Sequence, residues 1–131
     1  MLEVLLKIAK QCDRRNEWTE QQWIDTLLNC IDKDQYILIQ EGNEIIAFSC
    51  WLFIKDFEKI GNQYIEDVNG KIAYIQCAYV KKGHRGLLYR MLREGVERHP
   101  DAECIFYCSD KLNNKKIIIP VNKWRNKCLV C

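Results

Sequence analysis

The sequence predicts an α/β domain in which a mixed β-sheet is flanked by helices. Three observations predict it: two amphipathic segments open the chain, strand-like apolar runs follow, and an apolar strand then passes through a glycine-punctuated turn into an amphipathic helix. With 131 residues, of which 48% are hydrophobic, the chain has apolar material for one core. We therefore expect residues 1–131 to form a single domain.

Two helices are predicted at the start of the chain. In residues 2–12, apolar side chains recur at helical spacing, namely Leu2, Leu5, Leu6 and Ala9. Thr19, with Gln22 three residues later, has the pattern of a capping box and predicts the start of the second helix. The buried side of that helix is expected to consist of Trp23, Leu27, Leu28 and Ile31.

Strands are predicted in the middle of the chain. Residues 36–40 and 44–54 are rich in β-forming side chains, and the Glu41-Gly42-Asn43 sequence between them is typical of a hairpin turn. The polar residues 55–71 predict a loop. Residues 72–80 are apolar on both alternating faces, which indicates a central strand that is covered on both sides.

A turn and a helix follow this central strand. Gly83 and Gly86 let the backbone turn with its amides exposed, and the helix predicted at 86–98, before Pro100, points its positive end at the same place. Strand, turn and helix together predict an anion cradle suited to phosphate. The buried face of the helix is expected to hold Leu87, Leu88, Met91, Leu92 and Val96, and further strands are expected at 103–108 and 116–121.

This strand-turn-helix unit resembles motif A of the GNAT N-acyltransferases. The family pattern is Gln/Arg-x-x-Gly-x-Gly/Ala, and Gly83-His84-Arg85-Gly86-Leu87-Leu88 is the stretch that aligns with it. Gly86 matches the central glycine, whereas Gly83 replaces Gln or Arg and Leu88 replaces the small last residue. The element order is also similar to that of the family, so the resemblance implies a GNAT-like mixed sheet and covers most of the chain.

The resemblance implies an acyl-CoA donor, in the first place acetyl-CoA, and an amine acceptor on a small molecule, a protein lysine or an N-terminus. The strand backbone around Gln76–Tyr79 would pair with the pantetheine arm, and the amides of His84–Leu88 would hold the pyrophosphate, with Lys82 or Arg85 supplying charge. The cofactor-binding residues implied in this way are Gln76, Cys77, Ala78, Tyr79, Val80, Lys82, Gly83, His84, Arg85, Gly86, Leu87 and Leu88.

Direct transfer to an amine needs a base for the amine and a proton donor for the departing thiolate. The central strand carries no Glu, so the acids nearby in sequence are Glu66 and Asp67 in the preceding loop and Glu103. Glu66, together with Asp110 just beyond the next strand, is taken as a candidate catalytic acid. Tyr107 is the candidate proton donor. The structural alternative is that Glu66 is a loop charge and Tyr107 a half-buried strand aromatic.

Two other functions stay open. One is a catalytically inactive GNAT-like module that binds a protein partner, which the missing strand Glu and the bulky Leu88 favour. The other is nucleic-acid binding through residues 123–127, where basic and aromatic residues interleave. A net charge of only +2 argues against nucleic acid and against an acidic membrane surface as partners.

The eight cysteines are expected to be free thiols, because most lie in periodic helix or strand segments. Cys128 and Cys131 have the spacing of a metal-binding pair, but they end the chain, and we expect no metal site. The first ten residues carry charges at Glu3, Lys7 and Lys10 and do not resemble a signal peptide. A cytoplasmic protein is therefore expected.

Overall fold

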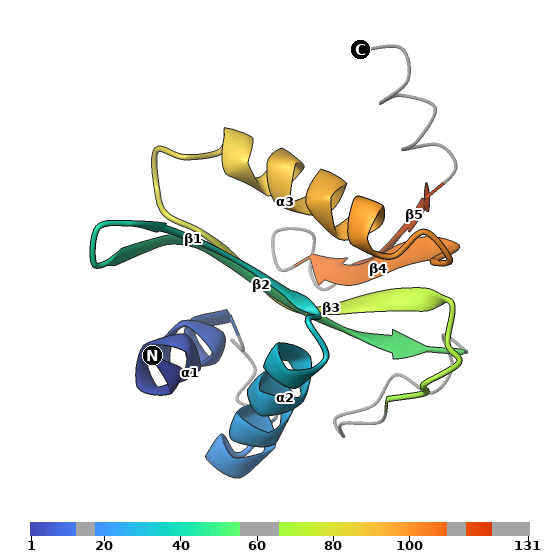
Figure 1. Cartoon of the computed structure of the whole chain (residues 1–131), viewed down its shortest axis with the longest axis horizontal. Coiled ribbons are helices and arrows are strands. Elements are labelled where there is room, and N and C mark those ends of the chain that lie inside the picture. The colour runs from blue at the N-terminus through green and yellow to red at the C-terminus, as the bar shows by residue number, and fades with distance from the viewer. Residues whose placement is uncertain (13–17, 56–65, 110–114, 122–131) are drawn as a thin grey trace.

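The computed structural model describes residues 1–12, 18–55, 66–109 and 115–121 (Figure 1). It contains a five-stranded mixed sheet with the strand order β1-β2-β3-β4-β5, flanked by helices as the sequence predicts. The elements in chain order are α1 (Leu2–Cys12), α2 (Glu20–Asp32), β1 (Tyr36–Glu41), β2 (Glu44–Ile54), β3 (Ile72–Val80), α3 (Gly86–Arg98), β4 (Cys104–Ser109) and β5 (Lys115–Pro120).

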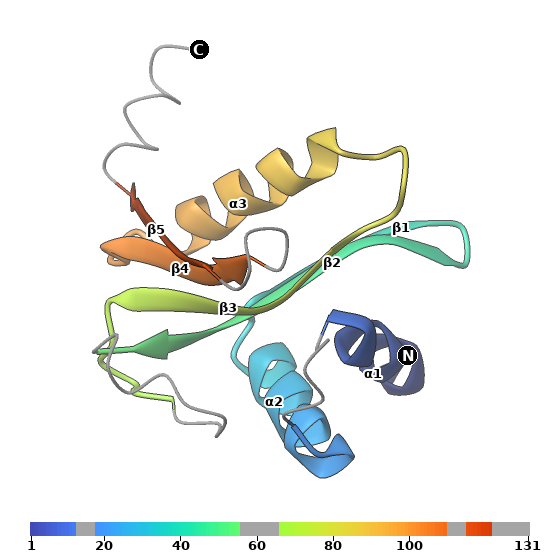
Figure 2. The same ribbon diagram turned by 180° about the vertical axis from the view of Figure 1, so that it is seen from behind.

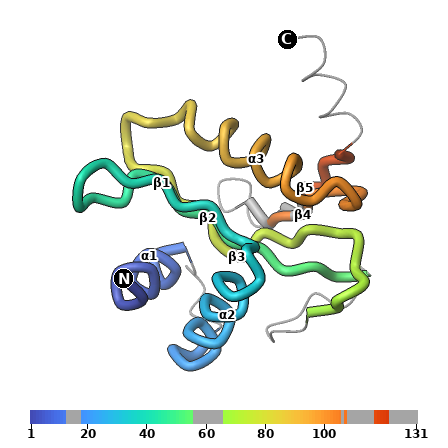
Figure 3. Tube along the Cα trace, in the orientation of Figure 1, coloured from blue at the N-terminus to red at the C-terminus, as the bar shows by residue number. Residues whose placement is uncertain are grey.

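The helices cover the two faces of the sheet. Helices α1 and α2 lie on one face and α3 on the other, as the two opposite views show (Figures 1 and 2). The Cα trace shows that the long, curved β2 and β3 run between these helical layers (Figure 3). Among the described residues, no helix has the length and apolar character needed to span a bilayer.

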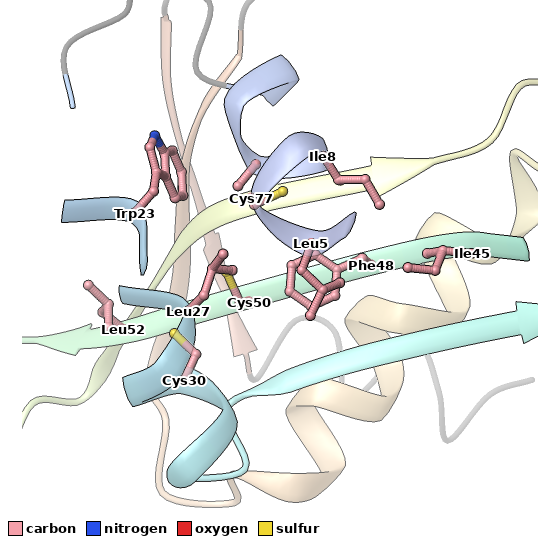
Figure 4. Close-up of a cluster of buried hydrophobic side chains, with 11 residues drawn as sticks. Leu5, Ile8, Trp23, Leu27, Cys30, Ile45, Phe48, Cys50, Leu52 and Cys77 are labelled. Atoms are coloured by element: carbon pink, nitrogen blue, oxygen red, sulfur yellow. The ribbon is translucent and has the colours of Figure 1, made fainter. Parts of the chain in front are cut away.

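The largest core lies between the sheet and the first two helices. Phe48 of β2 and Leu27 of α2 are fully buried there, and Cys50 and Cys77 face the helices from neighbouring strands (Figure 4). Two smaller clusters lie under α3 and include Met91 and Val96. Because β2 and β3 contribute side chains to both layers, they form the centre of the molecule, as predicted for residues 72–80.

The N-terminus of α2 is fixed by the predicted capping box. The Thr19 hydroxyl accepts from the Gln22 amide at 3.2 Å, and the Gln22 side chain accepts from the Thr19 amide at 2.8 Å. The expected buried side was wrong at Leu28, which is 49% exposed, whereas Thr26 and Cys30 are buried. The buried side of α2 therefore consists of Trp23, Thr26, Leu27 and Cys30, and the Cys30 thiol donates to the Trp51 carbonyl of β2 at 3.3 Å.

The strands on the N-terminal side form an antiparallel meander. The β1–β2 hairpin turns at Gly42, whose positive φ of 60° suits glycine. Strand β2 then pairs antiparallel with β3 over almost its whole length. Helix α3 ends at Arg98, two residues before Pro100, as expected.

Candidate functional site

The parallel strands β3 and β4 diverge soon after they meet. They pair at only three positions, Ile72 with Cys104, Ala73 with Ile105 and Tyr74 with Phe106. Strand β4 continues to Ser109 in pairing with β5, and β3 continues to Val80 in pairing with β2. Within the described part of the chain, residues 75–80 therefore have no strand along the edge that faces β4. We call this segment the open edge of β3.

A β-bulge lies where the strands diverge. Cys50 is opposite Cys77, but the next residue of β2, Trp51, is opposite Ile75, so Gln76 is an extra residue in β3. A bulge bends the strand that contains it and increases its twist, and bulges are common near active sites. The bulge at Gln76 thus accounts for the turning of β3 away from β4.

The backbone groups of the open edge alternate in direction. The Lys81 amide donates to the Ile46 carbonyl of β2 at 2.8 Å, which fixes the hydrogen-bonding phase of the β2–β3 ladder. In an antiparallel pair every second residue bonds to the partner strand, so Tyr79 and Cys77 bond to β2. The N–H groups of Ala78 and Val80 consequently point toward the open edge.

The turn after β3 leaves several amides without an acceptor. His84 donates to the Lys81 carbonyl at 3.1 Å, Leu87 to His84 at 3.0 Å and Leu88 to Arg85 at 3.2 Å. The amides of Gly83, Arg85 and Gly86 make no hydrogen bond within the described part of the chain. Of the amides of 84–88 that the sequence indicates, those of Arg85 and Gly86 therefore remain available near the positive end of α3, and the Gly83 amide is a further available donor.

Both glycines of the turn suit an anion site for different reasons. Gly83 has φ +94°, a conformation that other residues rarely adopt. Gly86 is the first residue of α3 and has no strained backbone, but no atom lies within 4 Å of the position of a Cβ there. Arg85, at the N-cap, makes no capping hydrogen bond with its side chain. Open space thus lies directly in front of the helix end.

The positive charge of the turn comes from two exposed side chains. Lys81 is paired with Glu44, whose hydrogen bond raises the pKa of the lysine and offsets its charge. Lys82 and Arg85 are exposed, and His84 is half-buried between them in the sequence. Lys82 and Arg85 are therefore the cations best placed to meet an anion at this turn.

An apolar pocket lies between α3 and the sheet. Its empty volume is about 510 Å³ including the opening. The interior that can hold the centre of a water molecule is much smaller, about 40 Å³. Its exposed lining residues are Ala78 on the open edge and Leu88 in the first turn of α3, which places the opening beside both. The exposure of Leu88 differs from the sequence prediction of a buried residue, because the pocket separates it from the sheet.

Two buried nitrogen atoms of residues that line this pocket have no hydrogen-bond partner among the described residues. They are Nε1 of Trp51 and Nε2 of His99, whose rings meet edge to face with centroids 5.4 Å apart. A buried donor without an acceptor costs about 1–3 kcal/mol. Burial lowers the pKa of His99, and the neighbouring charge of Arg98 lowers it further, so the imidazole is neutral near pH 7.

Glu66 is the centre of a hydrogen-bond network. Its carboxylate accepts from Gln35 at 2.8 Å, from the Phe53 amide at 3.1 Å and from Asn29 at 3.2 Å, and it is paired with Lys33. Burial alone would raise the pKa of Glu66, but these hydrogen bonds, that of Lys33 foremost, outweigh it and lower the pKa. Glu66, as a carboxylate, therefore ties α2 and the residues between α2 and β1 to β2.

The structure does not bring Glu66 to the turn. Phe53, which binds Glu66, is opposite Ala73 near the start of β3, whereas the turn follows Val80 at the other end. Seven strand residues separate these positions by roughly 23 Å at 3.3 Å per residue. A carboxylate with a lowered pKa and four donors around it is also a poor proton acceptor.

The other two candidates lie on the β4 side. Tyr107 follows Phe106, the last residue of β4 that pairs with β3, and its side chain packs half-buried against the Val96 cluster. Tyr107 thus stands on the strand that borders the divergence. Asp110 lies outside the described residues.

Four cysteines gather beneath the sheet and extend to the open edge. The Cys77 and Cys12 sulfurs are 3.2 Å apart, and the Cys12 thiol also lies 3.9 Å from the Ala78 carbonyl, to which it donates. The hydrogen bond to Cys12, and then burial, raise the pKa of Cys77, and the hydrogen bond to Cys30, and then burial, raise that of Cys50. These thiols are protonated and poor nucleophiles.

Five cysteines are free thiols, as predicted for them; they are Cys12, Cys30, Cys50, Cys77 and Cys104. Cys128 and Cys131, together with the basic 123–127 segment, lie outside the described residues. Within the ranges that the structure describes, no group of three or more His, Cys, Asp or Glu side chains is arranged to hold a metal ion.

The pair formed by Trp51 and His99 was not predicted. These residues are 48 positions apart, and only the packing of α3 on β2 brings them together, so no local pattern could indicate their contact.

The sequence of this chain matches no model of a known protein family, and no curated protein matches it significantly.

Proposed function

We propose that this protein is a GNAT-like N-acyltransferase that uses acetyl-CoA or another acyl-CoA to acylate an amine. The observation that carries the proposal is the divergence of β3 and β4 directly beside the N-terminus of α3. An extended ligand arm and a phosphate group can be accommodated there together, one along the open edge and the other at the helix end. The element order and the Gly83–Leu88 stretch support the same assignment.

The residues present fit a CoA ester. The outward N–H groups of Ala78 and Val80 can bond to the amides of an extended arm in the way that a strand would. The amides of Gly83, Arg85 and Gly86 have no acceptor among the described residues, and a pyrophosphate bound to them would be stabilised by the dipole of α3. Lys82 and Arg85 add positive charge to this end.

The bound ester would supply an acyl group activated as a thioester. Tyr107 borders the divergence from the β4 side, where its hydroxyl is suited to give a proton to a leaving thiolate. Glu66 is committed to its network, so we do not assign it the role of base. Asp110 follows β4 and remains our candidate for that role.

Calorimetric titration of the purified protein with acetyl-CoA and with CoA tests the proposal. We expect dissociation constants in the micromolar range, since the site offers both backbone donors and charge. An acylation assay against a panel of amines and lysine peptides would then identify the acceptor. The absence of binding up to millimolar acetyl-CoA and CoA would contradict the proposal.

The site is tested by two substitutions at one position. Gly86→Asp should abolish binding of acetyl-CoA, because it places a negative side chain in the space before the helix end. Gly86→Ala is the matched control, since its Cβ meets no atom within 4 Å, and it should bind almost as well as the parent. Arg85→Ala should weaken binding fivefold to tenfold, about 1 kcal/mol, and less at high salt.

Circular dichroism should show that all three variants are folded. Equal binding by folded Gly86→Asp and the parent would place the phosphates elsewhere.

The second candidate function is a non-catalytic GNAT-like module that binds a protein partner. The commitment of Glu66 to a structural network favours it, because one of the candidate acids is then unavailable for proton transfer. A module of this kind would remain folded but would acylate no amine in the panel. Acetyl transfer that is lost in Tyr107→Phe, with acetyl-CoA binding retained, would exclude it.

A further inference from the structure

The apolar pocket under α3 adjoins the open edge of β3. Ile75 and Ala78 belong both to the open edge and to the lining of the pocket, and Leu88 belongs to the pocket and to the first turn of α3. An aliphatic chain that extends from a ligand bound along the open edge would therefore enter this pocket first. We propose that this pocket accepts the aliphatic chain of a short acyl group that is longer than acetyl.

This inference rests on the proposed function, because the chain would arrive as a CoA thioester. It concerns the identity of the acyl group, which the proposed function leaves undetermined between acetyl and other acyl groups. The proposed function and the pocket assignment can be tested separately, because binding of CoA tests the first and the effect of acyl chain length on affinity tests the second.

The lining explains why an aliphatic chain is the expected guest. The buried wall consists mainly of hydrocarbon, and it is formed by Trp51, Ala73, Met91, Val96, Ile105 and Val121. The interior of the pocket is small: the volume that can hold the centre of a water molecule is about 40 Å³. A chain of a few methylene groups fits this space, whereas a long fatty tail does not.

The charges around the pocket favour a thioester over a free acid. Among the described residues, the lining contains no Lys or Arg, and burial lowers the pKa of His99, so this imidazole is neutral at pH 7. A carboxylate would therefore enter without a counter-charge. Trp51 is 95% buried and its N–H has no acceptor among the described residues, so it can donate to a neutral oxygen of the acyl group.

Gly95 gives the pocket a position at which its width can be changed. It lies in the C-terminal half of α3, and a Cβ there would be 3.8 Å from the Trp51 ring and 3.9 Å from Ile37. These are ordinary contact distances, so Gly95→Ala adds one methyl group to the wall without a clash. Alanine also favours the helix over glycine, and the variant should therefore fold.

The test is a calorimetric series of CoA, acetyl-CoA, butanoyl-CoA, hexanoyl-CoA and decanoyl-CoA on the full chain. We expect affinity to rise about fourfold for each methylene added beyond acetyl until the pocket is full, and then to stop rising. Equal affinities for all esters, with CoA bound, would overturn the pocket assignment and leave the proposed function standing. Silence with every compound, CoA included, would overturn both.

Two variants locate the chain. Gly95→Ala should weaken hexanoyl-CoA severalfold and leave CoA unchanged, and an unchanged hexanoyl-CoA affinity would contradict the assignment. In a ¹⁵N correlation spectrum, the indole N–H signal of Trp51, identified by its loss in Trp51→Phe, should move with hexanoyl-CoA and stay in place with CoA. The same movement with hexanoate alone, and none with hexanoyl-CoA, would assign the pocket to free acids instead.

Discussion

At the scale of single residues, Glu66 shows how one carboxylate can join three elements. Its partners lie on α2, before β1 and on β2, and its side chain is 95% buried. A buried carboxylate is costly unless its oxygen atoms are bonded, and each of the four donors meets that need. The network thus fixes the end of the sheet that lies opposite the glycine turn.

We predict that Glu66→Gln lowers the free energy of unfolding by about 1–3 kcal/mol at pH 7, because its amide group would face donors. The pKa of Glu66 is lower in the folded state than in the unfolded chain, so its contribution is complete above about pH 4.5 and is lost as the pH falls through the folded-state pKa. Urea unfolding of parent and variant between pH 7 and pH 3 measures this, and the two stabilities should converge in acid.

Asp67→Asn is the control for this prediction. Asp67 is the next residue and is paired with the exposed Lys55 at 3.4 Å, so its loss should cost less than about 1 kcal/mol. A larger loss in Asp67→Asn than in Glu66→Gln, or a parallel pH course in the parent and Glu66→Gln, would contradict the role assigned to Glu66.

The sequence identifies Glu66 as an acidic residue, but it does not predict the hydrogen-bond network around its carboxylate. Its four donors come from residues 13 to 37 positions away, and such contacts leave no periodic pattern. The Gly83–Leu88 turn was predictable because its signal is local: two glycines, adjacent cations and a helix. The hydrogen bonds that use the amides of His84, Leu87 and Leu88 were not predicted, because they depend on the exact pitch of the first helical turn.

At the scale of elements, the end of β2 is closely packed by the loop that leads to β3. A Cβ on Gly70 would lie 2.6 Å from the carbonyl oxygen of Ile54 and 2.7 Å from its nitrogen. These are backbone atoms and cannot rotate away. The absence of a side chain at position 70 therefore lets the loop pass directly against β2.

Gly70→Ala should consequently destabilise the protein by about 1–3 kcal/mol or more, as overpacked substitutions do. Gly86→Ala is the matched control, because it has open space and an ordinary helical backbone, and it should change stability little. Thermal unfolding of both variants decides the matter. A Gly70→Ala variant as stable as the parent would show that the loop is free to move from β2.

The divergence of β3 from β4 has its own signature in hydrogen exchange. The amides of Cys77 and Tyr79 bond to β2 and should exchange slowly, whereas those of Ala78 and Val80 face the open edge and should exchange much faster. Exchange followed by NMR distinguishes these neighbours. Uniform protection from 77 to 80 would contradict the open edge, and slower exchange of 78 and 80 with acetyl-CoA would locate the ligand arm there.

The elements themselves were largely predictable, because their signals lie within single segments. Alternating apolar residues indicated the strands, and the Thr19 capping box marked the start of α2. The bulge at Gln76 could not be predicted, since nothing in the sequence from Ile75 to Cys77 indicates an extra residue. It results from the registers of two strands, and it is the feature that separates β3 from β4.

At the scale of the whole molecule, β2 and β3 tie the two helical layers together. Cys50 and Cys77 belong to the core beneath α1 and α2, while Trp51 and Ala73 belong to the core beneath α3. Loss of either layer would expose apolar surface on the strands that support the other. Both layers should therefore unfold together.

Thiol labelling tests this cooperativity. The Cys50 and Cys77 thiols are buried and have raised pKa values, so in the native protein they should react only through global unfolding. The urea dependence of their labelling, measured by mass spectrometry, should coincide with the loss of circular dichroism. Labelling of either thiol at urea concentrations where the helical signal is intact would show that the first layer opens alone.

The open edge has a consequence for which molecules this protein can bind. An unpaired strand edge usually attracts any exposed strand, including one from a second copy of the chain. Here the edge is flanked by Cys12 of α1, which donates to the Ala78 carbonyl, and by Leu88 of α3, which lines the same pocket as Ala78. We expect these neighbours to hinder a strand that belongs to a folded sheet more than a single thin, flexible arm. Part of the sheet would then stay unpaired in solution without aggregation through that edge.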